Sequence, residues 1–258
     1  MSDRQSGFAE KNALITGGTK GLGLSTAKLF AAQRCNVYLS YRSDHETAKN
    51  AAQEIRQLGV KCEVFQADLS EEGALNHLFD ELQTKTSSLD YYVHNAVATA
   101  FKDLLELKSH HIDKTLNITV KGFILGVQRC VEMMKEGGAV ISVSGMDTRK
   151  AVPRHGLLGA AKSALETLTQ YFAHELAHKK IRVNGVNPGF LATDSTRKYL
   201  GPAFDQVSAG FVRNVPLRRE ASLNEVAEVI LFLASHHASW IVGQTICVDG
   251  GLDFSLPH

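Results

Sequence analysis

The sequence predicts an α/β protein built on a doubly wound parallel sheet. Short apolar segments alternate with amphipathic segments along almost the whole chain. Such alternation favours parallel strands covered by helices on both faces, and right-handed crossovers make the arrangement doubly wound. A length of 258 residues and a hydrophobic content of 44% suit one domain with a sizeable core. We therefore expect a single domain over residues 1–258.

Seven apolar segments are predicted to be strands and six amphipathic segments helices. The predicted strands are residues 12–16, 36–41, 61–67, 89–96, 138–144, 181–187 and 244–249. The predicted helices are residues 22–33, 45–58, 71–86, 109–135, 156–178 and 223–236. Residues 190–222 carry no strand pattern and follow the carboxyl end of a predicted strand, so we expect a substrate-covering lid there.

Composition argues against several classes of protein. Lys and Arg number 28 and Asp and Glu 27, so the net charge of +1 gives no sign of a nucleic acid or membrane-surface partner. No apolar run is long enough to cross a membrane, and the polar start "MSDRQSGFAEK" is not expected to be a signal peptide. The four cysteines form no CxxC and indicate reduced thiols in a cytoplasmic protein.

A glycine-rich segment, "TGGTKGLG" at residues 16–23, joins the first predicted strand to the first predicted helix. Glycines at such a turn let the backbone approach a pyrophosphate, and the helix N-terminus offers it free N–H groups. This context predicts a dinucleotide site of the Rossmann type. The loop residues expected to contact the cofactor are Gly17, Thr19, Lys20, Gly21, Leu22 and Gly23.

The end of the second predicted strand indicates which dinucleotide binds. An acidic residue there would bind a ribose 2′-hydroxyl, but the sequence "SYRSD" places Arg42 at this corner, with Lys20 in the nearby loop. Two cations favour a 2′-phosphate and hence NADPH. The alternative is that Arg42 is a solvated surface charge, and the acidic Asp44 just downstream counts against a 2′-phosphate site.

These motifs, together with "ADLS" (67–70), "HNAV" (94–97), "NPGFLATD" (187–194) and "GQTICVDGG" (243–251), resemble the short-chain dehydrogenase/reductase family over nearly the whole chain. The resemblance implies an adenine site at Asp68 and Leu69 and a ribose site at Asn95 and Ala96. It also implies that four residues hold the nicotinamide carboxamide, namely Pro188, Gly189, Leu191 and Thr193. Val97 replaces the glycine usual in the family.

The usual catalytic set of the family is Asn, Ser, Tyr and Lys, and this chain departs from it. Lys162 matches the lysine, which in the family contacts the nicotinamide ribose, but the serine position is Gly145 and the tyrosine position is Leu158. The asparagine position falls at Thr119 or, two residues away, at Asn117. Leucine cannot donate a proton, so ketone reduction by the usual mechanism is not expected.

A second pattern in the family fits better. Enoyl-thioester reductases carry their tyrosine seven residues before the lysine, and "AVPRHGLLGAAK" (151–162) resembles their motif with His155 at that place. Histidine can donate a proton near neutral pH, so His155 is the candidate donor beside Lys162. The alternatives for His155 are a pocket residue without acid duty and a surface histidine.

Three nearby features stay open at this level. Ser144 is a weaker substitute for the missing serine, because strand alternation turns it to the other face. Asp147 and Arg149 either pair with each other or line the pocket entrance. No metal site is expected, since His174 and His178 lack a third ligand and indicate a solvated helix face.

Three functions are compatible with this sequence. The first is an NADPH-dependent reductase of the carbon–carbon double bond of an enoyl thioester, carried on coenzyme A or an acyl carrier protein. The second is an atypical carbonyl reductase acting on a 3-oxoacyl or polyketide substrate. The third is a redox-inactive family member, acting as a non-redox catalyst or binding subunit. The resemblance also implies a homodimer or homotetramer.

Overall fold

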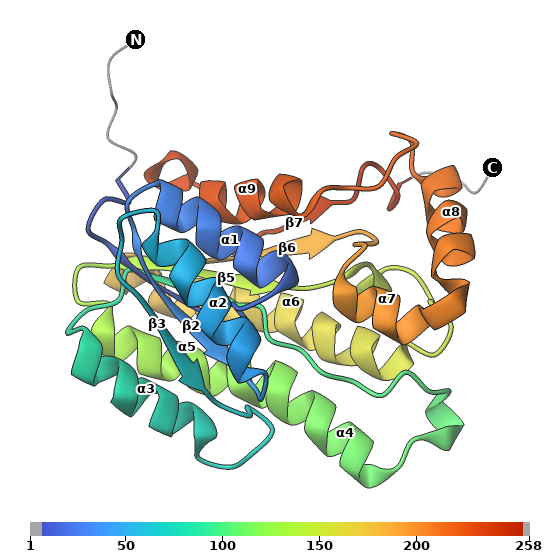
Figure 1. Ribbon diagram of the computed structural model, residues 1–258, viewed down its shortest axis with the longest axis horizontal. Coiled ribbons are helices and arrows are strands. Elements are labelled where there is room, and N and C mark those ends of the chain that lie inside the picture. Colours follow the sequence, from blue (N-terminus) through green and yellow to red (C-terminus); the bar gives the residue numbers. More distant parts are fainter. Residues whose placement is uncertain (1–6, 255–258) are drawn as a thin grey trace.

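The computed structural model describes residues 7–254, so the first six residues of the polar N-terminal segment lie outside the described range. It contains a seven-stranded sheet in the order β3-β2-β1-β4-β5-β6-β7, with every pair parallel (Figure 1). The strands are β1 Asn12–Ile15, β2 Asn36–Tyr41, β3 Cys62–Gln66, β4 Tyr91–His94, β5 Gly138–Val143, β6 Ile181–Pro188 and β7 Thr245–Val248. This confirms the predicted fold class, and each strand lies within about a residue or two of its predicted range.

Helices cover both faces of the sheet because successive strand residues point to opposite sides. Ile15 and Leu39 face one core, which α1 (Gly21–Ala32), α2 (His45–Arg56) and α9 (Leu223–Ala234) cover. Leu14 and Tyr38 face the other core. The helices on that side are α3 Ala74–Lys85, α4 Ser109–Leu116, α5 Gly122–Met133 and α6 Gly156–Leu176, as Figure 1 shows. Short 3₁₀ turns are η1 Leu104–Glu106, η3 Met146–Thr148, η4 Ala177–Lys179 and η6 His236–Ala238.

The helix predicted at 109–135 is not continuous. A π-helical turn, η2 (Asn117–Lys121), separates α4 from α5. The Nε2 of His94 at the end of β4 donates to the Thr119 carbonyl at 3.1 Å, and its Nδ1 accepts from the Tyr92 hydroxyl at 3.0 Å. Burial lowers the pKa of His94 to about 3, so the ring is neutral and can play both roles. The buried histidine thus satisfies a carbonyl at the bulge, a partnership that apolar periodicity does not reveal.

The predicted lid segment, residues 190–222, is largely helical. It contains α7 (Asp194–Leu200), η5 (Gly201–Ala203) and α8 (Phe204–Asn214), which lie beyond the carboxyl end of β6 (Figure 1). The Phe190 ring stacks on Phe211 with centroids 4.7 Å apart, and the Arg197 guanidinium lies 4.0 Å from the centroid of Phe204. These contacts fold the segment onto itself.

Two features bear on the compositional predictions. No helix within residues 7–254 is long and apolar enough to cross a membrane. All four cysteines are free thiols; Cys35, Cys62 and Cys130 are buried and Cys247 is partly buried.

Candidate active site

The glycine-rich loop between β1 and α1 has the tight backbone that its sequence predicts. Gly17 and Gly21 have φ angles of +61° and +54°, a region that favours glycine. A Cβ on Gly23 would lie 2.3 Å from the Gly17 carbonyl oxygen, and one on Gly18 would lie 2.6 Å from Leu39 Cδ2. Side chains at these positions would therefore force the loop open.

The N-terminus of α1 is prepared for an anion. Lys20 is its N-cap residue, and within the described chain the Lys20 side chain makes no capping hydrogen bond and the first turn carries no acidic residue. The first N–H groups of a helix and its macrodipole attract negative charge. The uncapped terminus and the glycine cradle together fit the pyrophosphate of a dinucleotide.

Asn95 fixes the shape of this loop from β4. Its Nδ2 donates to the carbonyl oxygens of Thr16 and Gly17, both at 3.1 Å. The Thr16 hydroxyl in turn accepts from the backbone N–H groups of Asn95 and Ala96, both at 3.0 Å. The ribose contact that the resemblance implies for Asn95 and Ala96 remains a prediction, but their place beside the glycine loop suits it.

The corner at the end of β2 carries exposed Lys20 and Arg42. Asp44 is used locally, because its carboxylate caps α2 by accepting from the Thr47 N–H at 3.1 Å, and hydrogen bonds from Thr47 lower its pKa.

The predicted adenine site follows β3. Asp68 accepts from the Ser70 N–H at 3.0 Å. Burial raises the pKa of Asp68, but hydrogen bonds from Ser70 outweigh it and the net direction is downward. Leu69 beside it is buried.

The segment after β6 approaches the glycine loop. A Cβ on Gly189 would lie 2.9 Å from Asp249 Cβ, so the chain passes close to the end of β7. Thr193 caps α7, its hydroxyl accepting from the Thr196 N–H at 3.1 Å. A Cβ on Gly21 would lie 3.7 Å from the Thr193 methyl. Pro188 ends β6 and Leu191 packs on the core, so these predicted nicotinamide contacts share one side of the site with the loop.

Lys162 lies about two turns into α6 and is almost fully buried. Its Nζ donates to the Val143 carbonyl at the end of β5, at 2.5 Å. Burial lowers the lysine pKa to about 8, and the charge of Asp147 works in the opposite direction. The carboxyl end of β5 thus fixes the Lys162 ammonium group in the region between β5 and α6, which we call the reacting end of the site.

His155 immediately precedes α6. Its side chain is 18% exposed, and its Nδ1 lies 3.4 Å from Asp147 Oδ2. The imidazole packs on Phe101 at 4.7 Å between centroids, and Tyr199 from α7 packs on both rings. The interpretation of His155 as a surface histidine is therefore wrong, because aromatic side chains from the 95–108 segment and the lid enclose it.

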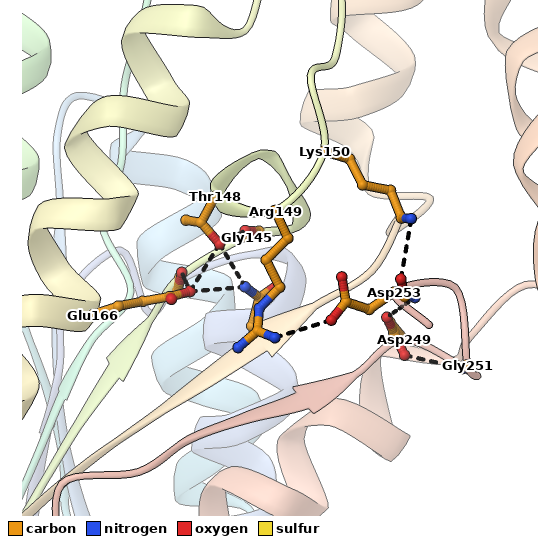
Figure 2. A network of polar contacts seen from close by, with 10 residues as sticks. Gly145, Thr148, Arg149, Lys150, Glu166, Asp249, Gly251 and Asp253 are labelled. Atoms are coloured by element: carbon orange, nitrogen blue, oxygen red, sulfur yellow. Dashed lines mark hydrogen bonds and ion pairs between the residues drawn. The ribbon is translucent and has the colours of Figure 1, made fainter. Parts of the chain in front are cut away.

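Arg149 does not pair with Asp147, because its guanidinium Nη1 lies 2.9 Å from Asp253 Oδ2 (Figure 2). Of the two arrangements open at the sequence level, the pairing is thereby excluded. Asp147 turns inward instead, and its Oδ1 lies 2.6 Å from where a Cβ on Gly145 would stand.

A polar network holds the turn η3, which carries Asp147, against α6 (Figure 2). Glu166 Oε1 accepts from the Ser144 hydroxyl at 2.5 Å, from Thr148 at 3.0 Å and from Asn187 Nδ2 at 2.8 Å. The Ser144 hydroxyl is thus engaged with α6, which argues against the weaker alternative that Ser144 serves as the catalytic serine. Sequence reasoning missed Glu166 and Thr148, since their roles arise only when β5, β6 and α6 meet.

Neither candidate for the family's asparagine position, Thr119 or Asn117, offers a free side-chain amide between β5 and α6. Thr119 is fully buried in the π-helical turn, and the Nδ2 of Asn117 donates to the Ser70 carbonyl at 3.4 Å. No cluster of three His, Cys, Asp or Glu side chains suited to a metal ion exists among residues 7–254.

Comparison with known proteins decides the family. A family model described as enoyl-(acyl carrier protein) reductase matches residues 17–253. The chain belongs to the short-chain dehydrogenase/reductase family. It is 33% identical over 245 residues to 1-cyclohexenylcarbonyl-CoA reductase of Streptomyces collinus, covering 95% of this chain and 88% of that protein. It is 31% identical over 244 residues to the 3-oxoacyl-[acyl-carrier-protein] reductase FabG of Staphylococcus aureus, covering 94% and 98%.

Solved structures support the same family. A short-chain dehydrogenase from Burkholderia cenocepacia in complex with NADP is 29% identical with a TM-score of 0.88, covering 95% of this chain and 98% of that one. The promiscuous reductase LugOII, which catalyses keto-reduction in lugdunomycin biosynthesis, is 30% identical with a TM-score of 0.87 and covers 95% and 98%. This short-chain dehydrogenase/reductase is accordingly an oxidoreductase that uses a nicotinamide cofactor.

Proposed function

We propose that the protein is an NADPH-dependent reductase of the carbon–carbon double bond of an enoyl thioester, with His155 as proton donor and Lys162 as its charged partner. The observation that carries the proposal is the enclosed position of His155. It lies at the start of the helix that holds Lys162, while Gly145 and Leu158 offer no polar side chain. The relative named 1-cyclohexenylcarbonyl-CoA reductase, whose substrate name describes a conjugated thioester, supports the same reaction class.

Held by the loop from Gly17 to Gly23 and by residues 188–193, the cofactor would supply a hydride to the β-carbon of the substrate, and negative charge would then develop on the thioester oxygen as an enolate. His155 faces Asp147 with Nδ1, so its Nε2 is the nitrogen available to the substrate. In our proposal His155 acts as an imidazolium with both ring nitrogens protonated: Nε2–H stabilises the enolate oxygen and then transfers its proton to the α-carbon, which leaves a neutral imidazole whose Nδ1–H faces Asp147. Lys162 adds positive charge from below. Phe101 and Tyr199 exclude water, which strengthens these interactions.

The choice of NADPH rests on Lys20 and Arg42, because Asp44 is committed to capping α2. The carrier would be coenzyme A or an acyl carrier protein. We also propose a cytoplasmic location and a homodimer or homotetramer. Fully exposed Trp240 and largely exposed Tyr171 on α6 are the kind of apolar surface that a partner subunit covers.

Carbonyl reduction is the second candidate. It is favoured by the likeness to FabG, named for a 3-oxoacyl substrate, and to LugOII, named for keto-reduction. Gly145 and Leu158 argue against it, because a carbonyl reductase of the usual kind needs a hydroxyl donor at the latter position.

The experiment offers crotonyl-CoA and acetoacetyl-CoA separately to the protein with NADPH, follows NADPH absorbance and identifies the products by mass spectrometry. We expect butyryl-CoA from the first substrate and little turnover of the second. His155→Ala should lower kcat by about 100-fold without changing NADPH affinity. His174→Ala, an exposed histidine on the same helix, is the matched control. Reduction of acetoacetyl-CoA alone, or full activity in His155→Ala, would overturn the assignment.

A further inference from the structure

We propose that Asp147 is a positioning residue for His155, and that residue 145 is glycine so that the Asp147 carboxylate can enter the site. Asp147 would accept from Nδ1–H of the His155 imidazolium and so hold the ring with its second proton, on Nε2, directed to the substrate. This inference rests on the proposed function, in which His155 donates the proton.

The first supporting observation is steric. A Cβ on Gly145 would lie 2.6 Å from Asp147 Oδ1, closer than real Cβ contacts come. A side chain at position 145 and this placement of the carboxylate therefore exclude each other. A serine at position 145 would push the Asp147 carboxylate out of its present position, because that carboxylate ends a flexible side chain and would move in place of the backbone.

A second glycine brings the same residue close to α6. A Cβ on Gly159 would lie 2.5 Å from the Asp147 backbone oxygen. Because that atom is backbone, it cannot swing aside as a flexible side chain does. Gly159 thus permits η3 to pack directly on the first turn of α6, beside His155.

The third observation is an unsatisfied charge. The Asp147 side chain is only 8% exposed, and its Oδ2 has no hydrogen-bond donor among residues 7–254. A buried carboxylate oxygen without a donor is costly, so it favours any donor within reach. His155 Nδ1, at 3.4 Å, lies just beyond a good hydrogen-bond length, and a small ring movement completes the bond.

The neighbouring charges are consistent with this role. Lys162 is the other cation that acts on Asp147, and its Nζ is bonded to the Val143 carbonyl. Arg149 and Lys150 on the same turn bind Asp253 instead. His155 is therefore the one side chain within residues 7–254 that forms an ion pair with Asp147, through Nδ1, which leaves Nε2 free to face the substrate.

The kinetic test is a double-mutant cycle on crotonyl-CoA reduction. Asp147→Asn should lower kcat by about 10- to 100-fold, the cost of a misplaced catalytic group, while KM and NADPH affinity change less than twofold. Asp147→Asn combined with His155→Ala should be no slower than His155→Ala alone. Losses that multiply in the double variant would overturn the proposal.

A spectroscopic test needs neither cofactor nor turnover. The ring ¹⁵N chemical shifts of His155, assigned with His155→Gln, report which nitrogen carries the proton. We expect a proton on both ring nitrogens, as in an imidazolium, in the native protein and a changed distribution in Asp147→Asn. Gly145→Ser should give the same change, because its side chain displaces the carboxylate. The control is Asp253→Asn, which removes the carboxylate that pairs with Arg149 just after the turn η3. It should leave the His155 spectrum unaltered.

These readouts separate the two proposals. If Asp147→Asn leaves the His155 spectrum unchanged, Asp147 does not position the ring, even if His155→Ala abolishes reduction. If the spectrum responds but His155→Ala keeps full activity, the proton-donor assignment fails, and the catalytic consequence drawn for Asp147 fails with it.

Discussion

The two ends of the site are built in different ways. At the cofactor end, the loop from Gly17 to Gly23 works through its backbone, and the absence of side chains makes the cradle. At the reacting end, between β5 and α6, specific side chains from three segments meet: Asp147, His155 and Tyr199. The first kind of site tolerates little change in shape. The second can exchange its chemistry while the fold stays the same, because the side chains that act there can change without changing the sheet that carries them.

The largest effect is expected where a backbone cradle is filled. Gly23→Ala places a Cβ 2.3 Å from the Gly17 oxygen. Overpacking of this kind costs about 3 kcal/mol, which corresponds to about a 100-fold loss of NADPH affinity if the loop opens. Fluorescence titration with NADPH measures it. Gly210→Ala in α8, where the nearest atom would be 3.9 Å away, is the control and should bind normally. Normal binding by Gly23→Ala would show that the loop does not cradle the cofactor.

Burial of the Lys162 ammonium group at the reacting end should destabilise the folded protein at every pH where the group is protonated. Its pKa in the folded protein, about 8, lies below the ordinary value of 10.5 because of burial. Between these values the unfolded state binds more protons, so the free energy of unfolding should rise with pH. The rise attributable to Lys162 is about 2 kcal/mol from pH 8 to 9.5. Denaturant unfolding of the cofactor-free protein, compared with Lys162→Met, isolates it. Parallel pH profiles for the two proteins would contradict the lowered pKa.

At the cofactor end, the glycine loop acts through its backbone, whereas Arg42 acts through its side chain and should determine whether NADPH or NADH binds better. Arg42→Ala should weaken NADPH binding by about tenfold, the value of one charge-assisted contact at an exposed site. NADH binding should stay unchanged. Lys49→Ala, an exposed cation on α2, serves as control. Equal losses for NADPH and NADH would remove the argument for a 2′-phosphate site.

The smallest effect concerns the lid. Tyr199 stacks on Phe101 with centroids 3.7 Å apart. Tyr199→Ala should remove about 1 kcal/mol of this contact, seen as a several-fold rise in the KM for crotonyl-CoA with little change in NADPH affinity. Phe232→Ala, which removes an exposed aromatic side chain on α9, is the matched control. An unchanged KM would indicate that α7 does not cover the substrate.

The fold and the cofactor end could be predicted because their signals are local. Apolar periodicity located all seven strands, and a strand followed by "TGGTKGLG" and a helix specifies a glycine cradle whatever the distant residues are. The π-helical turn at Asn117–Lys121 escaped prediction, since it depends on His94 reaching the Thr119 carbonyl from another strand. The helices of the lid escaped because contacts such as Phe190 on Phe211 support them.

The sequence by itself determined the doubly wound sheet, the glycine loop and the presence of Gly145, His155 and Leu158 ahead of Lys162. Only the tertiary structure decided what surrounds these residues. It enclosed His155 between Phe101 and Tyr199, and it directed Arg149 to Asp253 rather than Asp147. The physical reason is the distance along the sequence over which each property arises. Periodicity and glycine φ angles are properties of a few consecutive residues, whereas the burial of Asp147 and its approach to His155 exist only once β5, α6 and the lid have packed together.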